Sequence, residues 1–599
     1  METALPFTPL GLDTMDSFRP VAKNWQIVGD VYVDQTQKRT FVPTPGTGIL
    51  LNSPEKGMKE NLFTTFEHGD LELEMDVMMP VHSNSGLYFM GRYELQLLDS
   101  WGKEPPQHSD IGGIYQRWDN TREKGKRGFE GHPPKVNAAK APGLWQHFKV
   151  KFLAPRFDSE GNKIENARFG EVWLNGILIH ENQEVTGPTR AATFQDEQAK
   201  GPLMIQGDHG PVAIKNMAYK LQTGQKIGIP TLSMKEYSNT ALKIPNLDTL
   251  ALEREIQADS LSALMVSGNN SQKILAYSGT MEVPVSGEYL FDMMVSGGGA
   301  LLLINKDTVA DLNGDFFPED RAIGRAQLQK GQVPFTFIYN KHRPYRSGFE
   351  LFVEGPGIAK YSLHAPGSIK RQETDENRIV IEPNETETVL QRGFLMHEGQ
   401  KRTHTISVAT PQGIHYAFDL ATGTLLLAWG GEFLDVTKMW FGRGGQQLET
   451  PLGLAISIHG DPDFAFLENE KTSWPDSIPQ NTRYRQLGYE LDKTGTPEFG
   501  IELDQTVLTN KFVPTDSLRR LQRFITVDAD TDIWHKLAEG SRIEALAQNT
   551  YGIDDKQYFL DFSGNAAYTP VIRESRDGGE ELLVKIPKGE QKLAYILSW

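Results

Sequence analysis

The sequence predicts an all-β protein made of several β-sandwiches. Apolar and polar residues alternate in short windows, for example at 71–78, 147–153, 288–295 and 348–354, and this period of two is typical of half-buried strands. The chain also has 57 Gly and 34 Pro residues, which suit short strands joined by many turns. Such dense alternation favours sandwiches over parallel sheets with crossover helices.

Helical periodicity is scarce along the chain. The best helical patterns lie at 248–263 and 534–548, where apolar residues recur with a spacing near that of an α-helix. We predict one short helix in each of these two stretches.

Composition excludes several classes of function. The 61 basic and 78 acidic residues leave a net charge of −17, which argues against a nucleic-acid partner because phosphate binding needs a basic surface. Cysteine is absent, so no disulfide, cysteine-based zinc site or cysteine nucleophile can form. No apolar run is long enough to predict a membrane span. The motifs of serine hydrolases, zincins, P-loop enzymes and dinucleotide-binding proteins are missing as well.

Changes in composition divide the chain into three blocks. The first is 1–222, and a linker rich in Gly, Pro, Ser and Lys follows at 223–246. The second block is 247–366, a polar connector spans 367–377, and the third block is 378–599. At roughly 100–200 residues per domain, this length predicts three to five domains.

The segment 83–99, SNSGLYFMGRYELQLLD, separates two kinds of side chain by alternation. One face is apolar and suits a core. It carries Leu87, Phe89, Tyr93, Leu95 and Leu97. The opposite face carries Tyr88, Met90, Arg92, Glu94 and Gln96. Polar hydrogen-bonding groups beside an aromatic ring are typical of a sugar-binding sheet face. The alternative is an outer face in water, stabilised by cross-strand pairs.

This segment resembles the signature of the 3-keto-disaccharide hydrolase family. Further motifs of the family follow in order over residues 10–222, at 66–80, 108–116, 145–153, 172–182 and 201–222. Two departures lie in the closing motif, where Lys215 replaces the usual Arg and Gly207–Asp208 adds a residue before His209. The resemblance implies a concanavalin-like or LamG-like jelly roll, followed by two further sandwich-type domains.

The resemblance also implies activity on glycosides already oxidised at carbon 3. The ketone acidifies the proton on carbon 2, so a base can remove it, the aglycone leaves from carbon 1, and water then adds back. This route needs a base, an acid and a group that stabilises the oxyanion. The candidates for these roles are His108, His209, Glu94 and Arg92. Each has a structural alternative, such as a loop hydrogen bond for the histidines or an ion pair for Arg92.

Other residues of the same motifs are of types that bind sugars. The candidates for substrate binding are Asn84, Tyr88, Gln96, Asp99, Trp101, Tyr115, Trp118 and Gln206, although aromatic residues are more often part of a core. A cluster of carboxylates and histidines could also hold a divalent cation that polarises the keto oxygen. The family implies a secreted or periplasmic protein, and its keto-sugar substrate implies an upstream sugar 3-oxidoreductase as a partner.

The second block resembles the sandwich domain named after the anthrax protective antigen, at 273–357. Members of that family bind glycans, sometimes through calcium, for which Asp307, Asp311 and Asp315 are candidate ligands. Acidic loop residues are commonly just solvated, and we expect a structural or accessory role.

The third block, at 394–445, resembles a β-rich module fused to bacterial sugar oxidoreductases and keto-glycoside hydrolases. Its polar and aromatic stretch either builds a second site or forms strand ends and turns. The residues concerned are His397, His404, His415, Asp435 and Arg443.

Two other classes of function stay open at this point. One is a glycan-binding protein without catalysis, and the other is an ordinary glycoside hydrolase with two carboxylates.

Overall fold

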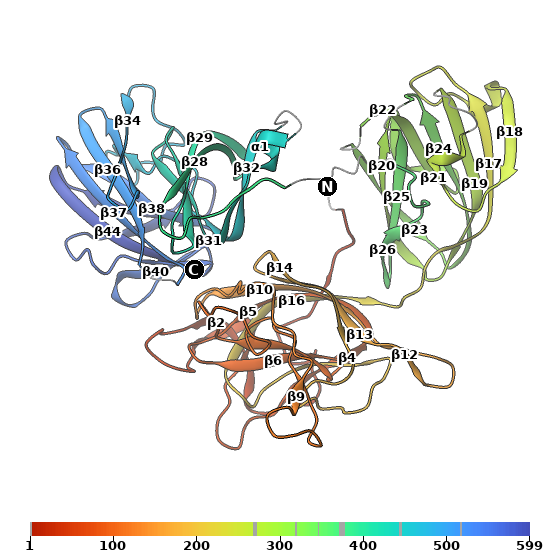
Figure 1. Cartoon of the computed structure of the whole chain (residues 1–599), viewed down its shortest axis with the longest axis horizontal. Coiled ribbons are helices and arrows are strands. Elements are labelled where there is room, and N and C mark those ends of the chain that lie inside the picture. The colour runs from red at the N-terminus through yellow and green to blue at the C-terminus, as the bar shows by residue number, and fades with distance from the viewer. Residues whose placement is uncertain are drawn as a thin grey trace. The chain divides into compact units, whose positions relative to one another are not determined.

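The computed structural model confirms the all-β class (Figure 1). It describes residues 3–266, 272–317, 320–344, 347–369, 378–441, 446–515 and 518–599. Two compact units account for the chain. The first comprises Met1–Pro9, His68–Glu72 and Ala218–Asp375, and the second comprises Leu10–Glu67, Leu73–Met217 and Glu376–Trp599.

The N-terminal jelly roll has two main sheets. The larger has the order β14-β13-β10-β5-β16-β3-β2, and β1 pairs with β16. Its strands are β1 (Thr8–Pro9), β2 (Trp25–Tyr32), β3 (Val42–Asn52), β5 (Asp70–Met78), β10 (Trp145–Leu153), β13 (Ala167–Leu174), β14 (Ile177–Val185) and β16 (Val212–Gln222). The smaller has the order β4-β15-β6-β7. Its strands are β4 (Leu62–His68), β6 (Asn84–Phe89), β7 (Tyr93–Leu98) and β15 (Gly201–Ile205).

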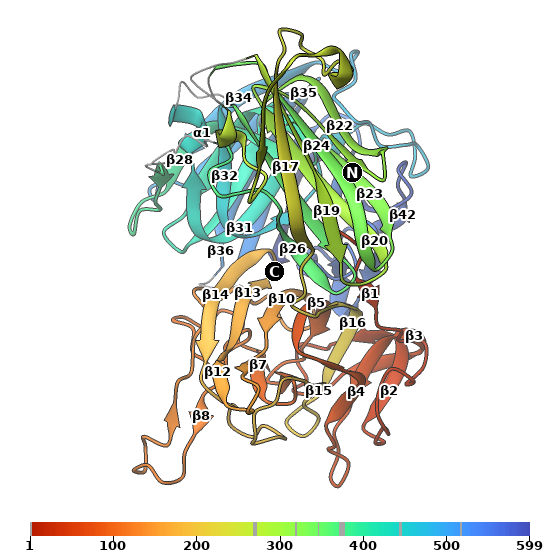
Figure 2. The ribbon, with the colours of Figure 1, turned by 90° about the vertical axis from the view of Figure 1, so that its right-hand side faces the viewer.

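Two small hairpins complete this part of the chain. They are β8 (Arg117–Trp118) with β9 (Gly128–Phe129) and β11 (Arg156–Phe157) with β12 (Lys163–Glu165). Figure 2 shows the β8 segment reaching out beyond the two sheets.

Aromatic side chains fill the space between the two sheets of the jelly roll. Phe89 of β6 stacks on Phe152 of β10 with 5.0 Å between ring centroids, and its edge meets Phe169 of β13 at 5.3 Å. Tyr93 of β7 lies 5.5 Å from Phe152 by the same measure. The predicted apolar face of 83–99 therefore faces the core, because alternation along β6 and β7 points these rings toward the larger sheet.

The next sandwich belongs to the first unit. One sheet has the order β18-β17-β19-β24-β21-β22, and the other has the order β23-β20-β25-β26. The strands are β17 (Gly228–Ser238), β18 (Leu252–Gln257), β19 (Lys273–Val283), β20 (Gly287–Ser296), β21 (Gly298–Ile304), β22 (Asp307–Phe316), β23 (Arg321–Leu328), β24 (Gly331–Lys341), β25 (Gly348–Gly355) and β26 (Ile358–Ser362). Short 3-10 turns lie at Leu247–Thr249 and Ala263–Met265. The two sheets share one apolar core.

The C-terminal domain begins with a small barrel. Strands β28 to β31 follow in order, and β32 closes the ring by pairing parallel to β28 and antiparallel to β31. The strands are β27 (Val380–Ile381), β28 (Val389–His397), β29 (Gln400–Ala409), β30 (Ile414–Asp419), β31 (Thr424–Asp435) and β32 (Leu448–Ser457). A single-turn helix, α1 (Thr437–Trp440), lies between β31 and β32.

Two further sheets complete the C-terminal domain. Their orders are β33-β38-β43-β42 and β34-β35-β36-β37-β44-β41-β40-β39. The strands are β33 (Phe464–Ala465), β34 (Tyr484–Leu491), β35 (Pro497–Leu503), β36 (Thr506–Pro514), β37 (Arg520–Ala529), β38 (Ile533–Gly540), β39 (Ile543–Ala545), β40 (Thr550–Ile553), β41 (Tyr558–Asp561), β42 (Val571–Glu574), β43 (Glu580–Ile586) and β44 (Gly589–Ser598). A 3-10 turn lies at Ala547–Asn549.

Both predicted helices are wrong. Residues 248–263 contain strand β18, which pairs with β17, and residues 534–548 contain most of β38 together with β39. In β38 the first six residues are all buried, so no polar face remained to reveal a period of two. Tertiary pairing overrode local helix propensity in both places.

Candidate functional site

The polar face of strands β6 and β7 is the centre of the candidate site. The segment 83–99 is a hairpin rather than one strand, with Tyr88 opposite Glu94 and Gly86 opposite Gln96. Met90 and Gly91 take positive φ angles of 56° and 66° in the turn. Because the turn keeps the alternation in phase, the predicted grouping of Tyr88, Glu94 and Gln96 on one face holds.

Glu94 is the most unusual group on this face. Its side chain is only 3% exposed, and its carboxyl fills the space that a side chain at Gly86 would need. Burial raises the pKa of Glu94 to about 8, the hydrogen bond with Tyr88 opposes this rise, and the charge of Asp208 adds to it. A carboxyl with such a pKa carries a proton at neutral pH.

Tyr88 connects Glu94 to the loop after β14. Its hydroxyl lies 3.3 Å from the carbonyl oxygen of Arg190 and also shares a hydrogen bond with Glu94. Toward Glu94 the Tyr88 hydroxyl is the donor, because their hydrogen bond lowers the pKa of Glu94 and so favours its carboxylate form. Burial raises the pKa of Tyr88, so the phenol stays protonated.

A second group of polar rings lies beside β7. The backbone N–H of Tyr115 donates to the carbonyl oxygen of Glu94, and the Tyr115 ring lies 5.5 Å from that of His108. Burial lowers the pKa of His108, against the opposing charge of Asp110. His132 carries a similarly lowered pKa through burial, and its Nε2 lies 3.4 Å from the amide nitrogen of Gln183. Both histidines are therefore neutral near pH 7.

Backbone hydrogen bonds of Gln96 and Gln206 connect neighbouring segments to the same hairpin. The backbone of Gln96 is hydrogen-bonded to Gly112 and Gly113, which holds the segment that carries Tyr115 against β7. Gln206 donates its backbone N–H to Gly86. Oδ1 of Asn84 is buried and has no hydrogen-bond partner in the described part of the chain. Such an acceptor can receive a hydrogen bond from a ligand hydroxyl.

The loop after β15 brings a dyad to this face. His209 Nδ1 lies 2.5 Å from a carboxylate oxygen of Asp208, and about half of each side chain is exposed. Asp208 acts on Glu94 through its charge. At the rim, the indole of Trp118 is 37% exposed, and the guanidinium of Arg190 lies 4.0 Å from its ring centre.

Three predicted residues lie elsewhere. Arg92 belongs to the turn between β6 and β7, where its guanidinium binds the carboxylate of Asp196 at 2.9 Å and the carbonyl of Met90 at 2.8 Å. Asp99 accepts a hydrogen bond from the backbone of His82, and the indole of Trp101 donates to the carbonyl oxygen of Trp599 at 2.7 Å. Asp99 and Trp101 line a separate cavity.

Metal ligands do not gather in the described residues: no group of three or more His, Asp or Glu side chains there could hold an ion. Of the candidate calcium ligands, Asp315 forms an ion pair with Arg343 at 2.6 Å.

The described members of the polar and aromatic stretch singled out in the third block each make their own contacts. His397 hydrogen-bonds Ser457 at 2.9 Å, and His415 contacts the carbonyl of Gly431 at 2.9 Å. Asp435 pairs with Arg378, while His404 lines a surface cavity. Arg443 lies outside the described residues.

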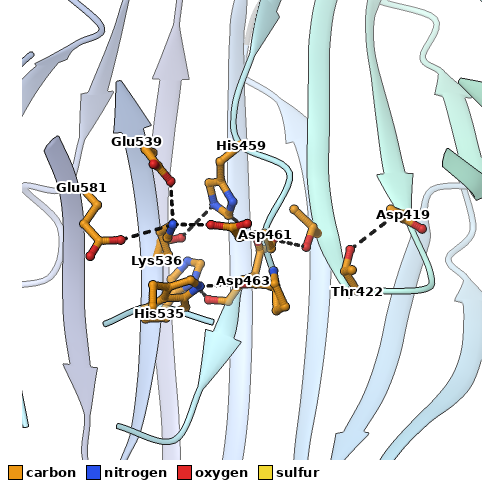
Figure 3. Close-up of polar contacts among 12 residues, drawn as sticks. Asp419, Thr422, His459, Asp461, Asp463, His535, Lys536, Glu539 and Glu581 are labelled. Atoms are coloured by element: carbon orange, nitrogen blue, oxygen red, sulfur yellow. Dashed lines mark hydrogen bonds and ion pairs between the residues drawn. The ribbon is translucent and has the colours of Figure 1, made fainter. Parts of the chain in front are cut away.

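A different polar network occupies this domain (Figure 3). Lys536 is 1% exposed, and its ammonium lies 2.7 Å from Asp461, 2.6 Å from Glu539 and 3.2 Å from Glu581. Next to it, fully buried Asp463 forms an ion pair with Arg523. Sequence reasoning missed this network because its members come from four separate segments without a shared motif.

His132, Asp208 and the space over Gly86 were also missed. The glycine in SNSGLYF, opposite a polar position of the next strand, was the one available signal.

Residues 20–220 match the family model of the 3-keto-alpha-glucoside-1,2-lyase-like domain. This match confirms the resemblance for the jelly roll and supports a carbohydrate-active enzyme. No curated protein matches the chain.

Solved structures with a similar part were also found. A proposed glycosyl hydrolase from Parabacteroides distasonis is 19% identical, covers 37% of this chain and 93% of its own, and has a TM-score of 0.25. A second one from the same organism is 18% identical, covers 36% and 100%, and has a TM-score of 0.25. An anti-sigma factor domain-containing protein from Clostridium clariflavum is 11% identical, covers 49% and 97%, and has a TM-score of 0.19. Likenesses at these scores carry no functional argument.

Proposed function

We propose that the jelly roll cleaves 3-keto-glycosides by proton abstraction at carbon 2, β-elimination and hydration. The observation that carries this proposal is Glu94, a buried carboxyl with a pKa of about 8 on a polar sheet face. The family match over residues 20–220 supports the substrate class. Strongly shifted groups beside other polar side chains are candidates for acid–base chemistry.

The reaction needs no oxidant or reductant. A base takes the proton from carbon 2, which the neighbouring ketone has acidified, and an enolate forms. The enolate expels the aglycone oxygen from carbon 1, and that oxygen takes a proton from an acid. Water then adds across the resulting double bond between carbons 1 and 2, so the net change is hydrolysis.

Glu94 is the proposed acid for the leaving oxygen. Its raised pKa keeps it protonated near pH 7, which is the form that can give a proton away. The Tyr88 hydroxyl holds the Glu94 carboxyl in place through their shared hydrogen bond and stabilises the carboxylate that forms when the proton has left. Donation leaves a carboxylate beside Asp208, and the next substrate cycle begins when Glu94 regains a proton.

His108 is the proposed base. Burial lowers its pKa, so the imidazole is neutral and able to accept a proton near pH 7. Tyr115 packs against the His108 ring and is tied through its backbone to Glu94. The proposed base and acid therefore belong to adjoining segments of the same face.

Substrate recognition would fall to the surrounding polar groups. Gln96, Gln206 and the unpartnered oxygen of Asn84 offer hydrogen bonds to sugar hydroxyls. Trp118 at the rim offers an exposed ring for stacking. Arg92 and Trp101 are committed to other contacts, and we assign them supporting roles in holding the fold.

The described residues contain no helix suited to crossing a membrane. We propose a secreted or periplasmic location from the family resemblance alone. A substrate with a ketone at carbon 3 must come from an enzyme that oxidises that position, so a sugar 3-oxidoreductase is the class of reaction expected upstream.

The test measures aglycone release from a chromogenic 3-keto-glucoside beside its unoxidised parent. We expect release only from the keto-sugar, with no change on addition of a chelator. Glu94→Gln should lower the rate by about a hundredfold to ten-thousandfold. The matched control is Glu67→Gln, an exposed position of β4 in the same sheet, which should keep full activity.

Two outcomes would overturn the proposal. Cleavage of the unoxidised parent would indicate an ordinary glycoside hydrolase. Saturable glycan binding without cleavage of either compound would indicate a non-catalytic binding protein.

A further inference from the structure

The C-terminal domain has a cavity far along the chain from the proposed catalytic face. Its volume is about 480 Å³, which is within the range of small-molecule sites. It lies over strands β28 and β29 and beside helix α1, and its lining includes Phe394, Thr403 and Trp440.

One wall of the cavity is aromatic and unusually open. Trp440, at the end of α1, is 65% exposed, although a Trp side chain normally finds cover. Phe394 and Met439 line the same cavity. A flat, exposed indole next to a concave surface is suited to stack on a flat ligand face.

The lining of the cavity also includes polar side chains. They are Arg392, His404, Gln447 and Gln486. The amides and the imidazole can donate and accept hydrogen bonds, while the guanidinium only donates. The amide nitrogen of Gln486 already donates to Leu420 at 2.8 Å, which fixes the side chain in place and directs its oxygen elsewhere. Amides, imidazole and guanidinium together can hydrogen-bond a ligand that carries many hydroxyls, since each hydroxyl both donates and accepts.

A buried acid lies beneath the floor. Glu449 is 2% exposed, and its carboxyl occupies the space that a side chain at Gly393 would fill, while Gly393 itself lines the cavity. Ser407 donates to one carboxyl oxygen at 2.6 Å, and the other oxygen is buried without a hydrogen-bond partner in the described residues. Burial raises the pKa of Glu449 to about 7.

We infer that this cavity binds a saccharide, with one pyranose ring stacked on Trp440 and its hydroxyls turned to the polar side chains. A pyranose has an apolar face of C–H groups and an equatorial rim of hydroxyls, and the cavity offers both an exposed indole and hydrogen-bonding side chains. The inference rests on the C-terminal domain alone, so it does not require the catalytic proposal for the jelly roll.

The experiment is calorimetric titration of the full chain with maltose and with cellobiose. We expect saturable binding of at least one of them, weakened tenfold or more by Trp440→Ala. The matched control is Phe441→Ala, because Phe441 is the next residue, is 43% exposed and does not line the cavity. Glu94→Gln separates this site from the jelly roll and should leave the affinity unchanged.

Three results would overturn the inference. The first is no binding of either disaccharide at tens of millimolar, and the second is equal affinity in wild type and Trp440→Ala. The third is an apolar dye that binds in a Trp440-dependent manner and that neither disaccharide displaces. Because Trp440 is exposed, circular dichroism of Trp440→Ala should match wild type, which keeps a loss of binding interpretable.

Discussion

Glu94 in the jelly roll and Asp463 in the C-terminal domain are both buried carboxyls, but their surroundings differ. Asp463 is ion-paired with Arg523, which also contacts Asn510 and Tyr595. Burial still raises the pKa of Asp463, but only to about 6, so it stays ionised at neutral pH. Glu94 interacts with a phenol and with another carboxyl, and it stays protonated.

An ionised carboxyl paired with a cation stabilises the fold, whereas a protonated carboxyl without a cation is available for acid–base chemistry. Around Asp463 and Lys536, opposite charges pair: Arg523 of β37 binds Asp463 just before β33, and Lys536 of β38 binds Glu581 of β43. The groups that shift the pKa of Glu94 are Tyr88 and Asp208, and neither is a cation. Glu94 therefore keeps its proton, which it can give to a ligand.

The largest effect is expected from breaking the buried pair. Arg523→Met leaves Asp463 buried without its cation, which should lower the free energy of unfolding by about 3–5 kcal/mol. Urea unfolding followed by tryptophan fluorescence measures the loss. The double variant Arg523→Met with Asp463→Asn should recover part of it, and a full loss in both would contradict a charge-based cause.

The pH dependence of stability should reveal Glu94. Its folded pKa of about 8 lies above the usual value of 4.5, so between these values the folded state binds the proton more strongly than the unfolded state. Stability should therefore fall as pH rises through this window, by about 1.4 kcal/mol per pH unit from this group. In Glu94→Gln this component disappears, so the variant becomes the more stable protein near pH 8. Identical slopes for both proteins from pH 5 to 8 would rule out the raised pKa.

The space over Gly86 should not tolerate a methyl group. Gly86→Ala would collide with the Glu94 carboxyl, which should cost about 1–3 kcal/mol of stability and displace the acid. The control is Gly564→Ala, where nothing lies near the added methyl group. Activity of Gly86→Ala equal to wild type would argue against a fixed position for Glu94.

The smallest effect is expected at an exposed ion pair. Arg325 and Glu288 meet at 3.0 Å with more than a third of each side chain exposed. Arg325→Met should change stability by less than about 1 kcal/mol, measured by the same urea unfolding. A loss as large as that of Arg523→Met would show that burial does not explain the contrast.

Sequence patterns predicted the fold class and part of the site. Alternation placed Tyr88, Glu94 and Gln96 on one face, and it did so even though the segment turns back at Met90, because the register of a hairpin preserves alternation. The motif at 108–116 contains both His108 and Tyr115, whose rings are in contact in the structure. Periodicity did not reveal that Arg92 lies in the turn and binds Asp196, since that contact joins residues far apart in sequence.

Other features depended on long-range packing and could not be read from local patterns. Strand β38 looked helical because both of its faces are buried. Trp101 is of a type that often stacks on sugars, but its indole N–H donates to the backbone carbonyl oxygen of Trp599. The partners of Lys536 come from separate segments of the C-terminal domain. A short sequence motif cannot reveal contacts between segments that are far apart in the chain.

The most direct test of the account is the pH–rate profile of kcat/KM on a 3-keto-glucoside for wild type and Glu94→Gln. The account predicts a wild-type rate that falls above a pKa of about 8, where Glu94 loses its proton. In Glu94→Gln the rate should be low and this basic limb should vanish. A basic limb that persists unchanged in Glu94→Gln would show that Glu94 is not the acid.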